Sequence, residues 1–368
     1  MSKQTAVDVP LVAPSLSETA KQRVRAVLDS GDLAAGEVVR QFEREFADFV
    51  GTDHAVATNN GTTALHAALA GLEIGAGDTV VTTPFSFIAT ANAIRLAGAD
   101  PVFADVDLQT ANIHPDAVER TIAAHDGDID AIMPVHLYGC PAEMDRLREL
   151  AADHDAVLIE DAAQAHGARY GGDHVGAIGD AGCFSFYPTK NMTTGEGGMV
   201  VTDDAEVARR ARSFINHGRA PDDGATHERV GHNFRLPNIA AAIGRVQLQR
   251  LPDFVAARRD NAAALTDALA ATDIAAPVEP DDSYHSYHQY TVRTDDRDAL
   301  QASLDDFGIG TGVYYPTPIH RQPAYDDQTV DAPAAERLAD TVLSLPVHPH
   351  LSDSELSAVT TGIDYVTG

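Results

Sequence analysis

The chain has 368 residues, of which 22% are charged and 44% are hydrophobic, and these ordinary values exclude a disordered or collagen-like protein. Acidic residues outnumber basic residues by 55 to 26, which gives a formal net charge of −29 at pH 7. A field of that sign repels phosphate backbones and anionic lipids. We therefore expect neither nucleic acid nor a membrane surface as the main partner.

The chain shows no signal for export or membrane insertion. Its first sixteen residues lack the apolar core of a signal peptide, and no run of 18 apolar residues occurs. The two cysteines, Cys140 and Cys183, cannot form a disulfide framework for a chain of this length. We therefore predict a cytoplasmic protein.

The predicted elements begin with two helices, one from a capping box at Ser15–Glu18 to Gly31 and one that ends at Gly51. Short apolar strands then alternate with helices. The predicted strands are His54–Thr58, Thr79–Thr83, Pro101–Asp105, Ala131–His136, Val157–Asp161 and Gly198–Thr202. The predicted helices are Thr62–Gly71, roughly Phe87–Leu96, Met144–Ala152 and Ala205–Phe214. Such β-α units predict a mostly parallel sheet with helices on both faces.

The last third of the chain has a different pattern of predicted elements. A helix is predicted from Ile239 towards Leu269, with a break near Pro252. A smaller α+β unit follows, with a strand at Tyr287–Val292, a helix at Arg297–Phe307 and a strand at Thr311–Tyr315. We therefore predict a large domain over residues 1–250 and a small C-terminal domain over residues 251–368. We expect the N-terminal helix to pack with the small domain.

Three segments carry polar residues where a plain core would have apolar ones. In the first, Asp161 lies at the carboxyl end of an apolar strand, where open α/β sheets bind ligands. A buried carboxylate there needs a cation or a hydrogen-bond donor. The alternative interpretation is a helix cap for the next segment.

The second segment contains Lys190, which follows the strand-like aromatic run Cys183–Tyr187 and precedes the glycines of Gly195–Gly198. Burial at such a strand end lowers the pKa of a lysine and frees a nucleophilic amine; the alternative is a solvated loop lysine. The third segment, Asn59–Ala64, joins a strand to a helix. Its backbone N–H groups and threonine hydroxyls form an anion cradle, unless the threonines serve only as N-caps.

Together the three segments supply the groups that hold pyridoxal phosphate. The helix N-terminus would take the phosphate, and the carboxylate would keep the pyridine nitrogen protonated. The lysine would form the Schiff base and then move a proton between substrate and cofactor.

At these residues the chain resembles the DegT/DnrJ/EryC1/StrS family of sugar aminotransferases, which are fold-type-I pyridoxal-phosphate enzymes acting on nucleotide-linked keto-sugars. The resemblance extends over nearly the whole chain, and its most specific parts are Glu160–Gly167, Phe184–Lys190, Gly195–Gly198 and Gly231–Leu236. It implies an α/β fold with a large domain on a mostly parallel, seven-stranded sheet, and a small C-terminal α+β domain.

The resemblance also implies roles around the cofactor ring. Lys190 would be the Schiff-base lysine, and Asp161 would face the pyridine nitrogen. Gln164 would contact the phenolic oxygen of the ring, and Phe87 would stack on the ring.

Further residues would hold the phosphate. Gly61, Thr62 and Ser185 would do so within one subunit, whereas Asn233 would reach the phosphate from the neighbouring subunit. A homodimer with a shared active site is therefore implied. His232 departs from the family pattern, in which a tyrosine is more frequent at this position.

On the substrate side, Tyr314, Tyr315 and His320 lie in the segment that approaches the sugar in the family. Packing at the domain boundary is the alternative role for the two tyrosines. Arg219 and Arg235 are candidates for binding the carboxylate of the amino donor or the diphosphate of the sugar nucleotide, since arginine pairs with either group through two hydrogen bonds.

The sequence thus predicts an aminotransferase that moves the amino group of L-glutamate to a keto group of a nucleotide-diphosphate sugar, with C3 favoured over C4, for amino-sugar and surface-glycan biosynthesis. Relatives with histidine in place of the lysine dehydrate sugars, so Lys190 favours transamination. The alternatives are a dehydratase or other sugar-modifying relative, and a non-catalytic binding or regulatory protein. His285, His288, His348 and His350 have no cysteine or paired carboxylate at a matching interval, and we predict no metal site.

Overall fold

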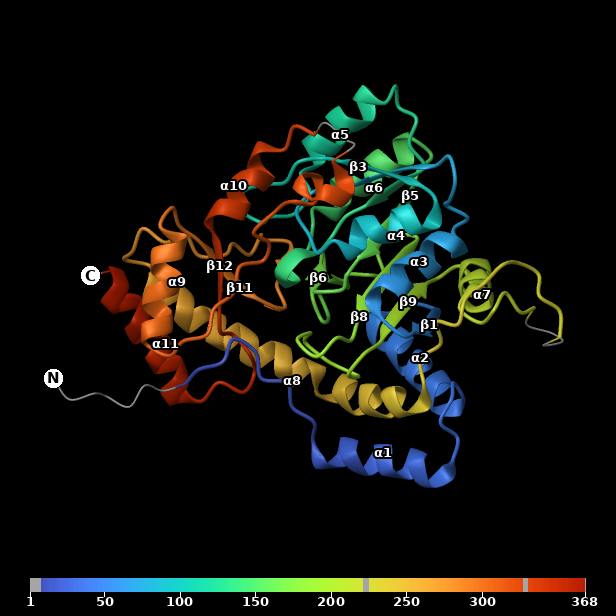
Figure 1. Ribbon diagram of the computed structural model, residues 1–368, viewed down its shortest axis with the longest axis horizontal. Coiled ribbons are helices and arrows are strands. Elements are labelled where there is room, and N and C mark those ends of the chain that lie inside the picture. Colours follow the sequence, from blue (N-terminus) through green and yellow to red (C-terminus); the bar gives the residue numbers. More distant parts are fainter. Residues whose placement is uncertain (1–7, 221–224, 327–329, 368) are drawn as a thin grey trace.

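The computed structural model of the protein describes residues 8–220, 225–326 and 330–367. Its centre is a seven-stranded sheet in the order β1–β9–β8–β5–β4–β2–β3 (Figure 1). In chain order these strands are β1 (His54–Thr58), β2 (Thr79–Thr82), β3 (Asp100–Phe103), β4 (Ala131–Met133), β5 (Val157–Asp161), β8 (Ala181–Ser185) and β9 (Gly198–Thr202). Only β9 runs antiparallel to its neighbours in this sheet, which confirms the predicted, mostly parallel architecture.

Helices cover both faces of this sheet because its strands are apolar on both sides. One face is covered by α3 (Gly61–Gly71), α4 (Ala89–Ala97) and α7 (Ala205–Phe214). The other is covered by α2 (Glu37–Val50), α5 (Pro115–Ala124), α6 (Met144–Asp153) and the first part of α8 (Asn238–Leu269). Along β9, Val200 packs into the first layer and Met199 and Val201 into the second, as the two-residue period of a strand requires.

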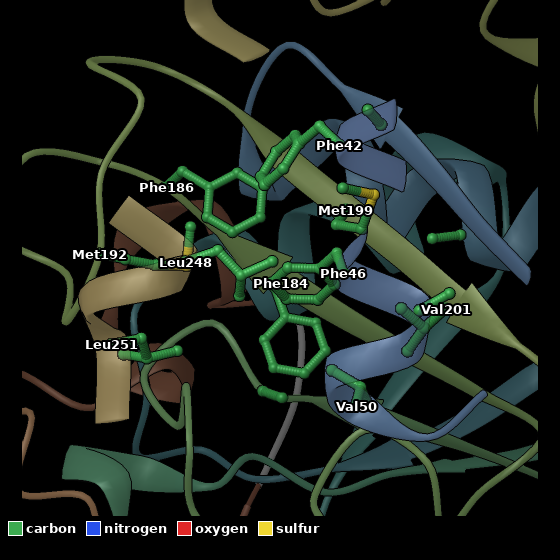
Figure 2. Close-up of a cluster of buried hydrophobic side chains, with 14 of the residues drawn as sticks. Phe42, Phe46, Val50, Phe184, Phe186, Met192, Met199, Val201, Leu248 and Leu251 are labelled. Atoms are coloured by element: carbon green, nitrogen blue, oxygen red, sulfur yellow. The ribbon is translucent and has the colours of Figure 1, made fainter. Parts of the chain in front are cut away.

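Phenylalanine rings fill the core between β8, β9, α2 and α8 (Figure 2). The ring centre of Phe46 lies 5.0 Å from that of Phe184 and 5.4 Å from that of Phe186, both in edge-to-face geometry. Such pairs add to the stability that burial already provides. The cluster therefore anchors β8, the strand that leads to Lys190.

The long helix α8 runs through Pro252 without interruption, so the predicted break there is wrong. Leu251, Phe254 and Val255 are buried around the proline, and this packing compensates for the hydrogen bond that proline cannot donate. Residue 250 therefore falls inside a continuous helix. The division into domains 1–250 and 251–368 stays a prediction.

The N-terminal part of the chain contacts two regions. Helix α1 (Glu18–Ser30) lies against α8, where it faces residues between Asn238 and Gln249 (Figure 1). The segment before α1 instead pairs with the C-terminal part, because Val9 forms a parallel bridge with Ile309.

The C-terminal part is built on a two-stranded antiparallel sheet of β11 (Tyr290–Arg293) and β12 (Val342–Leu345). Its helices are α9 (Arg297–Asp306), α10 (Pro333–Thr341) and α11 (Asp353–Thr367). The predicted strand at Thr311–Tyr315 is wrong, because only Gly312 pairs there, with Ser344. Beyond Gly312 the chain leaves the sheet for the cavity described below.

The remaining elements are short. A three-stranded sheet contains β6 (Arg169–Tyr170), β7 (Asp173–His174) and β10 (Ser283–Tyr284), and the 3₁₀ turns are η1 (Leu137–Gly139), η2 (Ile319–Arg321) and η3 (Pro323–Tyr325). In the described part of the chain, none of the helices has the length and apolar character needed to cross a bilayer.

Candidate active site

A cavity of about 560 Å³ opens at the carboxyl ends of β5 and β8, a volume typical of small-molecule sites. Parallel strands end at the same edge of a sheet, so residues far apart in the sequence meet there. Its wall contains nine of the predicted site residues: Gly61, Thr62, Phe87, Asp161, Gln164, Ser185, Lys190, Tyr314 and Tyr315.

Asp161 is the last residue of β5 and is only 4% exposed. Its Oδ2 accepts a hydrogen bond from the hydroxyl of Thr90 at 2.8 Å, and its Oδ1 accepts one from the backbone N–H of Ala163 at 3.1 Å. Burial raises the pKa of this carboxyl, while the two donors and the nearby Lys190 act in the opposite direction. No helix follows Asp161 directly, so the alternative of a helix cap is wrong.

Lys190 lies on the loop after β8, where its backbone N–H donates to the carbonyl of Tyr187 at 2.9 Å. Burial lowers the pKa of its amine to about 8, and the Asp161 carboxylate acts in the opposite direction. The amine is thus poised to lose its proton near neutral pH. Of the three lysines in the sequence, Lys3, Lys21 and Lys190, it is Lys190 that lines the cavity.

The N-terminus of α3 forms a corner of the cavity. The side-chain oxygen of Asn60 accepts a hydrogen bond from the N–H of Thr63 at 2.9 Å, so the pair caps the helix. Within the described residues the N–H groups of Gly61 and Thr62 make no hydrogen bond, and they are available to an anion. A methyl group on Gly61 would lie 2.7 Å from Cβ of Ser185, so glycine permits the close approach that brings the serine hydroxyl to the same corner.

Gln164 is held between two tyrosines. Its side-chain oxygen accepts a hydrogen bond from the backbone N–H of Tyr138 at 2.8 Å, and its amide nitrogen donates to the hydroxyl of Tyr315 at 3.0 Å. Phe87 is 57% exposed, and its ring centre lies 6.1 Å from that of Tyr315. An exposed ring on a cavity wall offers a stacking surface to a planar ligand.

The other four predicted site residues are absent from the wall that the described residues form. His320 is buried, and its Nε2 lies 3.1 Å from Oε1 of Glu336. Arg219, Asn233 and Arg235 belong to the segment between α7 and α8, which projects at the right of Figure 1. Arg235 pairs with Thr58 at the end of β1, close to the cavity, but its side chain is absent from the described wall.

Several wall residues were missed by sequence reasoning. Thr90 and His288 line the cavity, together with Leu11 and Val12 from the N-terminal segment. The sequence offers a hint for Thr90, since it is a polar residue on the buried face of a predicted helix. The sequence offers no hint for Leu11 and Val12, because their position at the cavity depends on the pairing of Val9 with the C-terminal part.

The four histidines considered as metal ligands do not gather around one point. Among the described residues, no group of three or more histidine, cysteine or acidic side chains is arranged to hold a metal ion. His285 instead stacks on Tyr287 with ring centres 3.9 Å apart.

The groups in the cavity fit pyridoxal phosphate. The free N–H groups of Gly61 and Thr62 suit a phosphate dianion, and the buried Asp161 carboxylate suits a protonated pyridine nitrogen. The Lys190 amine and the exposed face of Phe87 lie on the same wall.

Comparisons with known proteins give a consistent result. The model of the DegT/DnrJ/EryC1/StrS aminotransferase family matches residues 14–364. A pleiotropic regulatory protein of Geobacillus stearothermophilus is 42% identical, covering 92% of each chain. A UDP-N-acetyl-3-dehydro-alpha-D-glucosamine 3-aminotransferase of Acidithiobacillus ferrooxidans is 40% identical, covering 92% of this chain and 90% of that one. The crystal structure of S. venezuelae DesV in complex with a ketimine intermediate superimposes with a TM-score of 0.90 at 41% identity, covering 94% of both chains.

Proposed function

The chain belongs to the DegT/DnrJ/EryC1/StrS aminotransferase family, and from this premise we propose that it moves the amino group of L-glutamate to the C3 keto group of a nucleotide-diphosphate sugar. That it is a sugar aminotransferase with pyridoxal 5′-phosphate as cofactor follows from the family. The observation that carries the proposal is the meeting of Lys190 and Asp161 in one cavity that also has room for a sugar.

The cofactor, when bound, supplies an electron sink for the charge that develops where a substrate carbon loses its proton. Asp161 would keep a proton on the pyridine nitrogen, and Phe87 and Gln164 would orient the ring. Gly61, Thr62 and Ser185 bind the phosphate through N–H and hydroxyl donors. These roles rest on the positions of the side chains around the cavity.

Lys190 moves the proton in both half-reactions. Its pKa of about 8 leaves roughly a tenth of the amine neutral at pH 7, far more than the ordinary value would, so Nζ can accept a proton from a substrate carbon and return it. A lysine at this position supports transamination over dehydration.

The substrate side of the cavity is mostly apolar. Leu11, Val12, Leu345 and Val347 line it beside the rings of Tyr314 and Tyr315, which suits the apolar faces of a sugar. Amination at C3 is supported by the name of the A. ferrooxidans relative and by the Tyr314-Tyr315-Pro316 run.

We also propose that the active site is shared between two copies of the chain. Asn233 and Arg219 are exposed and Arg235 is half-buried between α7 and α8, and none of the three lines the described cavity of its own chain. From a partner subunit, Asn233 would bind the phosphate, and the arginines would bind the donor carboxylate or the diphosphate. His320 would contribute to the sugar site only if its pairing with Glu336 opens.

The first half-reaction is tested by absorbance spectroscopy. Glutamate should bleach the near-visible band of the lysine-bound cofactor in the wild type, and Lys190→Ala should lack that band and fail to turn over. Lys21→Ala removes an exposed lysine that pairs only with Glu18 in the described structure, and it should behave like the wild type. No such band in the wild type after addition of cofactor would refute the mechanism.

Product analysis tests the second half-reaction. The glutamate-treated enzyme should regain its band when a 3-keto nucleotide sugar is added, with an amino sugar as product. Recovery with 4-keto sugars alone would refute the C3 assignment and leave the amino transfer intact.

A further inference from the structure

The side chain of Arg258 on α8 is buried without a counter-charge. It is 5% exposed, and Nη1 donates to the carbonyl oxygens of Tyr287 at 3.0 Å and His288 at 3.1 Å. Its Nε has no partner among the described residues, and no carboxylate there pairs with the guanidinium. The next residue, Arg259, differs, because it pairs with Glu279 at 2.6 Å.

An unpaired buried cation is costly, since burial removes the water that stabilises its charge. The same burial lowers the pKa of Arg258 to about 9. Its two carbonyl partners carry only partial charges, so most of the cost is left without compensation.

A second, small cavity lies beside Arg258. Its volume is about 30 Å³, enough for one small ion or one or two waters. The polar side chains of its wall include Lys190, Asn191, Gln247, Arg258, His348 and His350. The chain has 55 acidic residues, yet none of them lines this cavity among the described residues.

Four histidines near Arg258 have pKa values below the ordinary one. Burial is the main cause of the lowered pKa values of His166, His288, His348 and His350, and the charge of Arg258 adds to it. Glu355 acts in the opposite direction on His348. The neutral imidazoles of His348 and His350, which line the cavity, each keep one N–H group that can donate to an anion.

We propose that this cavity binds one small monovalent anion of the chloride type, with the guanidinium of Arg258 as its principal ligand. A water molecule would fill the space but leave the charge of Arg258 uncompensated. Sulfate and phosphate are too large for this volume. The overall charge of −29 repels anions, so binding depends on the local cluster of donors.

The anion has a structural consequence for the main cavity. Arg258 holds the carbonyl oxygen of His288, and His288 lines the wall next to Lys190. An anion that fixes the guanidinium therefore also fixes this wall. The proposal does not depend on the sugar substrate or on the amino donor.

Two measurements on the wild-type holoenzyme test the proposal. Crystals soaked in bromide should show an anomalous peak within hydrogen-bond distance of Arg258. The melting temperature should rise by about 2 °C in chloride relative to gluconate at the same ionic strength, and the rise should saturate. A peak without that rise would indicate an adventitious ion only, and a water in place of bromide would overturn the proposal.

A pair of variants separates the site from general salt effects. Arg258→Met should lose the difference between chloride and gluconate. Arg259→Met, whose side chain has its own carboxylate, should keep it even if its melting temperature falls in both salts. Retention of the saturable rise in Arg258→Met would refute the assignment. If Arg258→Met does not fold, the bromide map of the wild type tests the assignment by itself.

Discussion

At the scale of single residues, the chemistry of the cavity depends on the surroundings of Asp161 and Lys190. Each group influences the pKa of the other, because Lys190 lowers that of Asp161 and Asp161 raises that of Lys190. Burial disfavours the charged form of both groups. Small changes in the hydrogen bonds around this pair should therefore alter cofactor binding and proton transfer.

Thr90 should be a positioning residue for Asp161. Thr90→Val removes the hydroxyl that donates to Oδ2, so the pKa of Asp161 should rise further and its carboxylate should hold a protonated pyridine nitrogen less well. We expect cofactor affinity to fall about tenfold, or about 1.4 kcal/mol. Titration of the apoenzyme with pyridoxal phosphate measures this affinity. Thr90→Ser keeps the hydroxyl and should keep the affinity; equal losses in both variants would contradict the role.

The uptake of cofactor should depend on pH through Lys190. Its pKa of about 8 lies below the ordinary value of 10.5, so between these values the unfolded chain holds a proton that the folded chain has released. The contribution of this group to stability therefore rises with pH across that window. We expect the rate of pyridoxal-phosphate uptake to rise with pH, with a midpoint near 8.

Stopped-flow absorbance measures this profile. Because Asp161 raises the pKa of Lys190, Asp161→Asn should shift the midpoint to lower pH. An unchanged midpoint in that variant would show that the two groups are not coupled.

At the scale of elements, the site depends on how closely the start of α3 approaches the end of β8. The added Cβ at Gly61 would meet Cβ of Ser185 at 2.7 Å, so only glycine allows this contact. Behind β8, the close-packed phenylalanine cluster of Figure 2 keeps the strand from moving away from α3. The phosphate corner is thus rigid from both sides.

Gly61→Ala should therefore weaken both the fold and the phosphate site. We expect a loss of about 1–3 kcal/mol in unfolding free energy, together with weaker cofactor binding. Denaturant unfolding and cofactor titration measure the two effects. Adding Ser185→Gly removes the clashing atom and should restore part of the stability, but not the cofactor affinity, because the phosphate-binding hydroxyl is lost with it. Gly75→Ala is the control, because its methyl group would meet no atom closer than 3.4 Å.

At the scale of the whole molecule, one chain does not complete the proposed site. Asn233, between α7 and α8, is exposed and absent from the wall of the described cavity, and His232 beside it stacks on Phe234 with ring centres 4.5 Å apart. An exposed asparagine outside its own cavity suits a role in the site of a second subunit. This arrangement predicts that active sites can be assembled from two defective chains.

Hybrid dimers test that prediction. Lys190→Ala and Asn233→Ala should each be poorly active alone. Purified hybrids, each with one site that has both residues intact, should recover about half of the wild-type activity. Dimers with both substitutions on one chain and none on the other have no site with both residues intact and should stay poorly active. The opposite pattern would place Asn233 in the cavity of its own chain.

Much of the large sheet could be predicted because its signal is local. Each strand is a short apolar run, and its alternation with helices predicts a mostly parallel sheet. The C-terminal part was harder, since β12 pairs with β11 across some fifty residues and gains its place only through that pairing. The strand-like segment Thr311–Tyr315 predicted a strand that the structure replaces with one bridge at Gly312.

By itself, the sequence singled out the groups to which the proposed chemistry is assigned. Asp161 stands at a strand end, Lys190 on the loop after a strand and Gly61 at a helix start, and neighbouring residues impose those positions. Only the tertiary structure decided that Thr90 holds Asp161, that His320 pairs with Glu336 and that Arg258 is buried with no carboxylate partner among the described residues. The physical reason is the distance along the chain over which each kind of interaction acts. Backbone propensity and hydrophobic period act over a few residues, whereas these contacts join segments that meet only when the sheet and the C-terminal part close on each other.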